Sequence, residues 1–193
     1  MKNGSFFALI YRMKYIGRWG LMRNSEPENI QEHSHMTAVI AHALAAIRRD
    51  VFGVPCDPDK CASLALFHDA SEIFTGDLPT PIKYHNREIT RAYHEVEDLA
   101  AKKLLSGLPV EVQDTYSELL EQKVGDDLKR LVKAADKLSA YIKCIEERKA
   151  GNNEFRSAEV QTRAALEEYG LPEVRYFLEN FIPAFELTLD ELE

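Results

Sequence analysis

Apolar residues recur at spacings of three and four along nearly the whole chain, which is the pattern of amphipathic helices. No stretch alternates apolar and polar residues between turn signals, as a strand would. The spacing predicts a first helix that includes Phe6 and Ile10 and ends near Gly17. It predicts a second helix that begins near Asn29, a good N-cap residue, and continues through Leu44.

The rest of the chain continues this helical pattern. Asp57 followed by Pro58 predicts the start of a third helix, because aspartate caps helix N-termini and proline suits the first helical position. A glycine and two prolines in the segment 75–81 interrupt the pattern. With no internal repeat and no linker-like composition, we expect one all-α domain over residues 1–193. Further helices are expected at roughly 87–106, 110–122, 127–150, 154–169 and 172–190.

Composition narrows the class of protein. A chain of 193 residues with 45% hydrophobic and 29% charged residues can fold around a core and is not of the disordered type. A net charge of −8 argues against a polymeric nucleic acid as partner. No stretch approaches the ~20 apolar residues of a membrane span, and Arg12, Lys14 and Arg18 interrupt the apolar start. We therefore expect a cytoplasmic protein with no membrane partner.

The three cysteines do not describe a disulfide framework or a zinc site. Their number is odd and they form no C-x-x-C pair. Cys61 and Cys144 lie within apolar helical patterns, so we interpret them as buried structural thiols.

Four residues that can bind metals lie on or beside apolar helical stripes. They are His33, the doublet His68-Asp69, and Asp136. Such side chains are costly to bury without a partner, and a divalent cation shared by two histidines and two aspartates would supply one. Nitrogen and oxygen ligands suit manganese, cobalt, zinc or iron. Each residue alone also fits a structural role, since His33 could be a hydrogen-bonded core residue and Asp136 could pair with a neighbouring lysine.

The ordered pattern H…HD…D resembles the metal-binding signature of the HD-domain phosphohydrolases, an all-helical superfamily. Several longer segments resemble the bacterial 5′-deoxynucleotidases within that superfamily, and the similarity extends over essentially the whole chain. These segments are NIQEHS at 29–34, HDASE at 68–72, GDLPTPIK at 76–83, AGNNEF at 150–155, and the pair Arg18-Trp19.

The resemblance implies a single-domain HD-type helical bundle that acts as a homodimer. It implies hydrolysis of deoxyribonucleoside 5′-monophosphates to deoxyribonucleosides and phosphate. It also implies one divalent transition metal per subunit, with cobalt, manganese and copper as candidates. The implied metal ligands are His33, His68, Asp69 and Asp136.

The resemblance assigns the remaining site residues as well. Glu72 would orient or deprotonate the attacking water, and Asp77 would lie near the leaving 5′-oxygen. Arg18 and Trp19 would bind and select the substrate, which His33, Asp77 and Asp136 would also contact. These six residues are all present in the sequence at the matching positions.

The residues themselves give these roles partial support. If the helix continues past Asp69, Glu72 lies on the same face as His68 and about 6 Å further along, a plausible distance for a carboxylate that acts on a metal-bound water. The alternative is that Glu72 is a solvated helix charge. Arg18 beside Trp19 offers a cation for phosphate and a flat apolar face, although such pairs often serve packing alone. Asp77 is either a turn residue or a carboxylate that two prolines hold in a stiff loop.

Two other functions fit the same ligand pattern. Hydrolases of guanosine tetraphosphate-type alarmones are also HD proteins, but they carry a second acid after the residue that corresponds to Glu72, and here Ile73 follows. The other possibility is a non-catalytic helical module that retains the ligands as a structural metal site.

Overall fold

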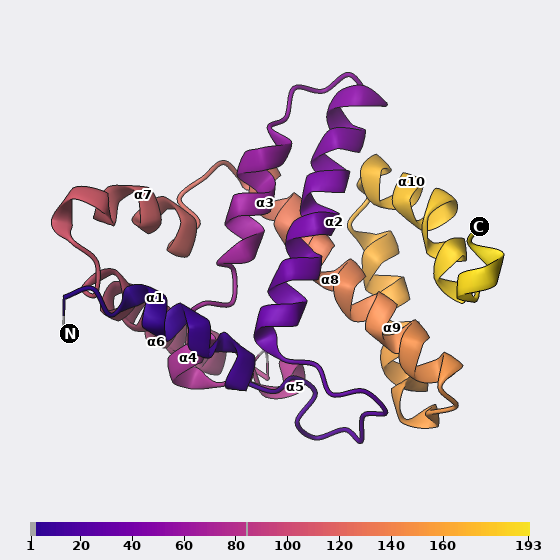
Figure 1. The fold of residues 1–193 in the computed structure, drawn as a ribbon, viewed down its shortest axis with the longest axis horizontal. Coiled ribbons are helices and arrows are strands. Elements are labelled where there is room, and N and C mark those ends of the chain that lie inside the picture. Colours follow the sequence, from indigo (N-terminus) through magenta and orange to yellow (C-terminus); the bar gives the residue numbers. More distant parts are fainter. Residues whose placement is uncertain (1–2, 84) are drawn as a thin grey trace.

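The computed structural model describes residues 3–83 and 85–193. In these ranges the secondary-structure elements are all helices (Figure 1). A single antiparallel bridge, between Gly17 and Asn29, accompanies the helices. The all-α prediction is therefore confirmed. The α-helices are α1 (Phe6–Ile10), α2 (Ile30–Asp50), α3 (Pro58–Leu66), α4 (Glu72–Thr75), α5 (Thr80–Lys83), α6 (Arg87–Leu105), α7 (Val110–Leu120), α8 (Asp126–Lys149), α9 (Arg156–Glu168) and α10 (Pro172–Asn180).

Helices α2, α3 and α8 form the centre of the molecule. In Figure 1, α2 and α3 run side by side and α8 crosses behind them. Helix α9 packs against α8, and α10 packs against α2 and α9. Buried apolar positions at helical spacing, such as Ile40 and Leu44 on α2 and Leu131 and Leu138 on α8, fill the space between them. Burial of these stripes is the main source of stability for such helices.

A second apolar cluster joins the N-terminal helix to the segment between α3 and α4. Phe6 of α1, Ala70, and Leu104 of α6 are buried in it, and Phe67 and Tyr116 pack against it. This cluster fixes the turn that carries His68 and Asp69 relative to α6.

The helix starts that the sequence predicts are present. Asn29 caps α2 through a reciprocal pair of hydrogen bonds with Glu32. Asp57 accepts a hydrogen bond from the backbone of Lys60, and Pro58 occupies the first position of α3. Cys61 and Cys144 are buried free thiols, as expected.

The structure corrects the prediction at both ends of the chain. The first helix is α-helical only to Ile10 and continues as a 3₁₀ helix over Tyr11–Tyr15. The last helix is shorter than the expected 172–190, because α10 ends at Asn180 and two 3₁₀ turns follow it. Pro183 lies in the first of these turns, where it lacks the N–H that a continuing α-helix needs.

The segment around the two prolines also contains more helix than expected. The short helix α5 includes Pro81, near its start, where a missing N–H costs no hydrogen bond. None of the helices in the described ranges is long and apolar enough to cross a membrane.

Candidate active site

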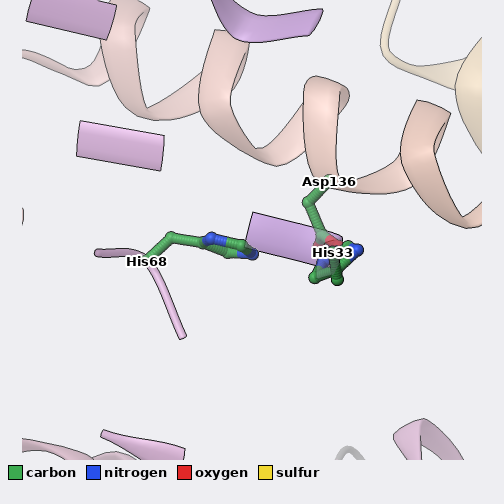
Figure 2. A group of neighbouring side chains, drawn as sticks. All are labelled: His33, His68 and Asp136. Carbon is green, nitrogen blue, oxygen red and sulfur yellow. The ribbon is translucent and has the colours of Figure 1, made fainter. Parts of the chain in front are cut away.

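Three side chains from distant parts of the chain converge into a group that can hold a metal ion. His33 comes from α2, His68 from the turn after α3, and Asp136 from α8 (Figure 2). Their ligand atoms all lie within 4.8 Å of one another. His33 Nε2 is 3.1 Å from Asp136 Oδ1, and the two imidazole rings have centroids 5.2 Å apart.

The two histidines are held by hydrogen bonds on the ring nitrogen that faces away from this group. His68 Nδ1 lies 2.7 Å from the carbonyl oxygen of Ala65, to which it must donate. His33 Nδ1 lies 3.2 Å from Ser139 Oγ. Such partners fix the orientation of metal-binding histidines and leave Nε2 available. His68 Nε2 is buried and faces the Asp69 carboxylate, 3.0 Å from its Oδ2.

Asp69 lies beside the two histidines. Its Oδ2 is 3.0 Å from His68 Nε2 and 3.6 Å from His33 Nε2. It is not one of the three residues whose ligand atoms all lie within 4.8 Å of one another. The structure thus brings His33, His68 and Asp136 together as a candidate metal site and places Asp69 beside the two histidines.

The charges of this group depend on one another. Burial alone would lower the pKa of His68, but the negative charges of Asp69 and Asp136 raise it to about 9. Burial opposes ionisation of the two aspartates as well, yet the histidines lower the pKa of Asp69 to about 2 and hold that of Asp136 well below its ordinary value. Asp136 forms no ion pair with Lys133 in the part of the chain that the structure describes.

The donor set fits a divalent transition metal. Two imidazole nitrogens and carboxylate oxygens match the ligand preferences of cobalt, manganese, copper and zinc. The Nε2 atoms of both histidines converge with anionic carboxylates in a buried site, and a bound cation would satisfy these groups together.

Glu72 reaches the site by a different route from the one expected. The third helix does not continue past His68, because α3 ends at Leu66 and residues 67–71 form a turn. The His68 ring binds the Ala65 carbonyl, which would accept the N–H of Asp69 in a continuing helix. Glu72 begins the next helix, α4.

Glu72 is only 4% exposed, so the expectation of a solvated helix charge is wrong. Burial, together with the negative charges of Asp69 and Asp77, raises the pKa of Glu72 to about 9. Its Oε1 lies 3.8 Å from the ammonium of Lys83, and its Oε2 is buried without a hydrogen-bond partner among the described residues. Carboxylates that act as general bases are often buried and often have a raised pKa.

Asp77 follows Gly76, whose φ of 71° and ψ of 168° suit glycine almost exclusively. Burial raises the pKa of Asp77, while the charge of Arg18 and the backbone of Trp19 act in the opposite direction. Asp77 is therefore placed beside the Arg18-Trp19 pair rather than in an isolated turn.

Arg18 and Trp19 lie at the edge of the same site. The charges of Asp69, Asp77 and Asp136 all act on the Arg18 guanidinium, which also forms an ion pair with Glu28 at 2.8 Å. The Arg18 Nε is buried with no hydrogen-bond partner in the described ranges.

Trp19 has a φ of 60°, in the left-handed region, and its ring packs edge-on against Phe155 at 5.1 Å. The segment AGNNEF, which includes Phe155, thereby supports the Arg18-Trp19 pair.

Sequence reasoning missed four residues that support the site: Ser139, Lys83, Glu28 and Glu147. Glu28 and Glu147 resemble ordinary surface acids in the sequence. Lys83 is the last residue of the segment GDLPTPIK, and nothing in that segment indicates that it lies beside Glu72. Ser139 lies one turn after Ala135 on α8 and could have been noticed as a polar residue within an apolar stripe.

Comparison with known proteins agrees with this arrangement. A family model described as 5′-deoxynucleotidase YfbR-like matches residues 5–185. The chain is 48% identical to 5′-deoxynucleotidase YfbR of Escherichia coli strain E2348/69, over the whole chain and 97% of that protein. It is also 48% identical to a 5′-deoxynucleotidase of Vibrio parahaemolyticus, with both chains covered completely.

Solved structures share the fold. An HD-domain phosphohydrolase from Listeria innocua is 28% identical, with a TM-score of 0.82 over 94% of this chain and 88% of that one. A cyanophage S-2L HD phosphohydrolase, bound to dA and one catalytic Zn²⁺, has a TM-score of 0.65 at 21% identity over 91% of this chain and 95% of that one. The chain thus has the HD-domain fold and belongs to the YfbR-like family of 5′-deoxynucleotidases.

Proposed function

We propose that the protein is a metal-dependent 5′-deoxynucleotidase, which hydrolyses deoxyribonucleoside 5′-monophosphates to deoxyribonucleosides and phosphate. The observation that carries this proposal is the convergence of His33, His68 and Asp136 beside Arg18 and Trp19. Relatives that are 48% identical over the whole chain carry the same activity in their names.

One divalent metal per subunit would be held by His33, His68 and Asp136, with Asp69 as the fourth ligand. When bound, such an ion lowers the pKa of a water molecule and offsets negative charge on the phosphoryl oxygens. The ligand set accepts cobalt, manganese or copper, and we propose one of these as the native metal.

Glu72 is proposed as the general base. Water attacks phosphorus, its proton passes to the Glu72 carboxylate, and the bond between phosphorus and the 5′-oxygen breaks. Burial and the negative charge of Asp69 raise the pKa of Glu72; a bound cation beside Asp69 would offset that charge and so favour the carboxylate form that accepts the proton.

Asp77 is proposed to lie near the leaving 5′-oxygen. Its pKa is also raised, chiefly by burial, which favours a form that can give that oxygen a proton.

Substrate binding is assigned to Arg18, Trp19, Asp77 and the metal-site residues His33 and Asp136. The Arg18 guanidinium is suited to phosphate because it offers several donors in a planar fork. Its buried and unpartnered Nε supports this assignment, since a phosphate oxygen would satisfy that donor.

We further propose that the protein acts in the cytoplasm as a homodimer. Helices α1, α6 and α7 pack together and leave large apolar side chains exposed, among them Phe7, Leu99 and Val110. Apolar surface of this kind favours association. Light scattering at micromolar concentration should give twice the mass of one chain, and a monomer would contradict the dimer.

The activity is tested by phosphate release from the five common deoxynucleoside monophosphates and their ribose counterparts. Metal-stripped protein is resupplied with cobalt, manganese, copper or magnesium, and the Glu72→Gln variant serves as the control. We expect metal-dependent release from the deoxy forms. Failure to release phosphate from any of them, with the metal shown to be bound, would overturn the proposal. Turnover of an alarmone instead would assign a different substrate.

A further inference from the structure

One carboxylate oxygen outside the expected site holds both residues of the Arg18-Trp19 pair. Arg18 Nη1 donates to Glu28 Oε2 at 2.8 Å, and Trp19 Nε1 donates to the same oxygen at 2.9 Å. The Arg18 and Glu28 side chains are only 12% and 14% exposed. Two donors on a partly buried, charged acceptor make strong and directional hydrogen bonds.

The backbone fixes this arrangement as well. The N–H of Arg18 donates to the carbonyl oxygen of Glu28 at 2.9 Å, and the N–H of Ile30 donates to that of Ile16 at 3.0 Å. These bonds surround the bridge between Gly17 and Asn29. Glu28 therefore lies directly opposite Arg18, immediately before the residue that caps α2.

The loop that leads to Glu28 is itself anchored to α8. Glu147 accepts hydrogen bonds from the backbone N–H groups of Ser25 and Glu26, and Lys143 donates to the carbonyl oxygen of Glu26. Glu28 is thus held on a supported loop, and its carboxylate can orient other side chains.

The two residues that Glu28 holds serve different parts of a nucleotide. The positively charged Arg18 guanidinium lies near the aspartates of the site, and the Trp19 ring lies beside the guanidinium. A shift of the shared acceptor would move both side chains together. Rigid orientation of the groups that bind a substrate can raise the reaction rate by orders of magnitude.

We propose that Glu28 is a positioning residue that couples phosphate recognition to sugar recognition by orienting Arg18 and Trp19 as one unit. The sugar selectivity of the site then depends on a carboxylate that does not touch the substrate. This inference rests on the proposed deoxynucleotidase activity.

The first test reads the geometry without turnover. Trp19 is the only tryptophan in the chain, so its fluorescence reports on this position alone. In the metal-loaded enzyme, Glu28→Ala should increase acrylamide quenching of Trp19 and lower its fluorescence anisotropy. Glu28→Gln keeps an oxygen acceptor for the indole and should remain close to the wild type.

The matched control is Glu26→Gln. Glu26 lies on the same loop, and its exposed side chain makes no hydrogen bond or ion pair in the described part of the chain. This variant should leave both fluorescence and kinetics unchanged. Circular dichroism at 222 nm establishes that each variant is folded.

The second test measures kcat and KM for one deoxynucleotide and its ribose counterpart. Glu28→Ala should lower kcat/KM for the deoxynucleotide by roughly tenfold or more and reduce the ratio of deoxy to ribo turnover, because loss of a charged hydrogen-bond acceptor misplaces both groups. Glu28→Gln should lower kcat/KM, because a neutral amide no longer attracts the Arg18 guanidinium. It should preserve the ratio of deoxy to ribo turnover, because the indole keeps an oxygen acceptor.

Unchanged quenching and an unchanged sugar ratio in folded Glu28→Ala would overturn the proposal. A lower kcat/KM with the same sugar ratio would also overturn it, because Glu28 would then act on Arg18 alone. Absence of all turnover in the wild type would refute the proposed function instead, and the fluorescence would still show whether Glu28 orients Trp19.

Discussion

Replacement of Glu147 by alanine should destabilise the protein strongly, although the residue lies outside the proposed chemistry. Glu147 is 1% exposed and forms a buried ion pair with Lys143, with 2.5 Å between Oε1 and Nζ. Its carboxylate also accepts hydrogen bonds from the backbone of Ser25 at 2.8 Å and from the side chain of Asn152 at 2.7 Å. The variant would leave the Lys143 ammonium buried and several donors unpaired.

Two estimates of the magnitude agree. Removal of one partner of a buried ion pair typically costs about 3–5 kcal/mol. Burial alone would raise the pKa of Glu147, but Lys143 and the surrounding N–H donors lower it from 4.5 to about 2. That difference corresponds to roughly 3 kcal/mol of folding stability at neutral pH. For a domain of this size, the melting temperature should fall by roughly 6–12 °C.

The pKa of Glu147 also determines how its contribution to folding stability depends on pH. Because the folded-state pKa of Glu147 lies below its unfolded value, its contribution is fully present well above pH 4.5 and is lost as the pH falls toward 2. The stability difference between wild type and Glu147→Ala should therefore shrink from roughly 3 kcal/mol at pH 7 to about 2 kcal/mol at pH 3.5.

Urea unfolding followed by circular dichroism at both pH values measures this difference. Glu146→Ala is the control, since Glu146 is exposed on the same helix and should change stability by less than about 0.5 kcal/mol. A penalty for Glu147→Ala below about 1 kcal/mol, or one that grows as the pH falls, would refute the reasoning. Glu147→Gln, which keeps the shape but not the charge, should show a smaller loss.

Three further predictions concern the site itself. Glu72→Gln should lower kcat by roughly 10²-fold or more and leave metal content, measured by elemental analysis, unchanged; full activity would exclude it as the base. Asp69→Ala should lose both activity and metal in the same measurement, and retained metal would show that it is not a ligand. Gly76→Ala should cost about 1–3 kcal/mol because its backbone conformation suits glycine alone. It should also lower kcat by displacing Asp77, and wild-type stability and rate together would contradict this.

The sequence predicted the parts of the site that follow from helical periodicity. His33 and Asp136 are polar residues beside apolar stripes, and such residues need partners in any fold that buries those stripes. The caps at Asn29 and Asp57 were predictable because they depend on local chemistry alone. The resemblance to a known family supplied the specific roles.

The features that the sequence did not predict depend on contacts that helical periodicity does not reveal. At the break after α3, the Ala65 carbonyl accepts from the N–H and the ring of His68 in place of the Asp69 N–H of a continuing helix, and no glycine or proline marks this break. Glu28 meets Arg18 and Trp19 across a bridge that closes a polar loop, between Gly17 and Asn29, and helical periodicity gives no information on such a loop. Pro183 was a visible signal for the end of α10, and its effect on the last helix could have been predicted.

The backbone of Trp19 has a consequence for laboratory evolution. A bulky residue in the left-handed region is unfavourable by about 1–3 kcal/mol, whereas glycine or asparagine adopts that conformation readily. Selection for thermostability alone would therefore favour replacement of this residue, and if Trp19 selects the sugar as proposed, the population would drift toward relaxed sugar choice. A library built from this scaffold should be sorted for discrimination between deoxyribose and ribose in every round, because the proposed role of Trp19 would set heat resistance against selectivity at position 19.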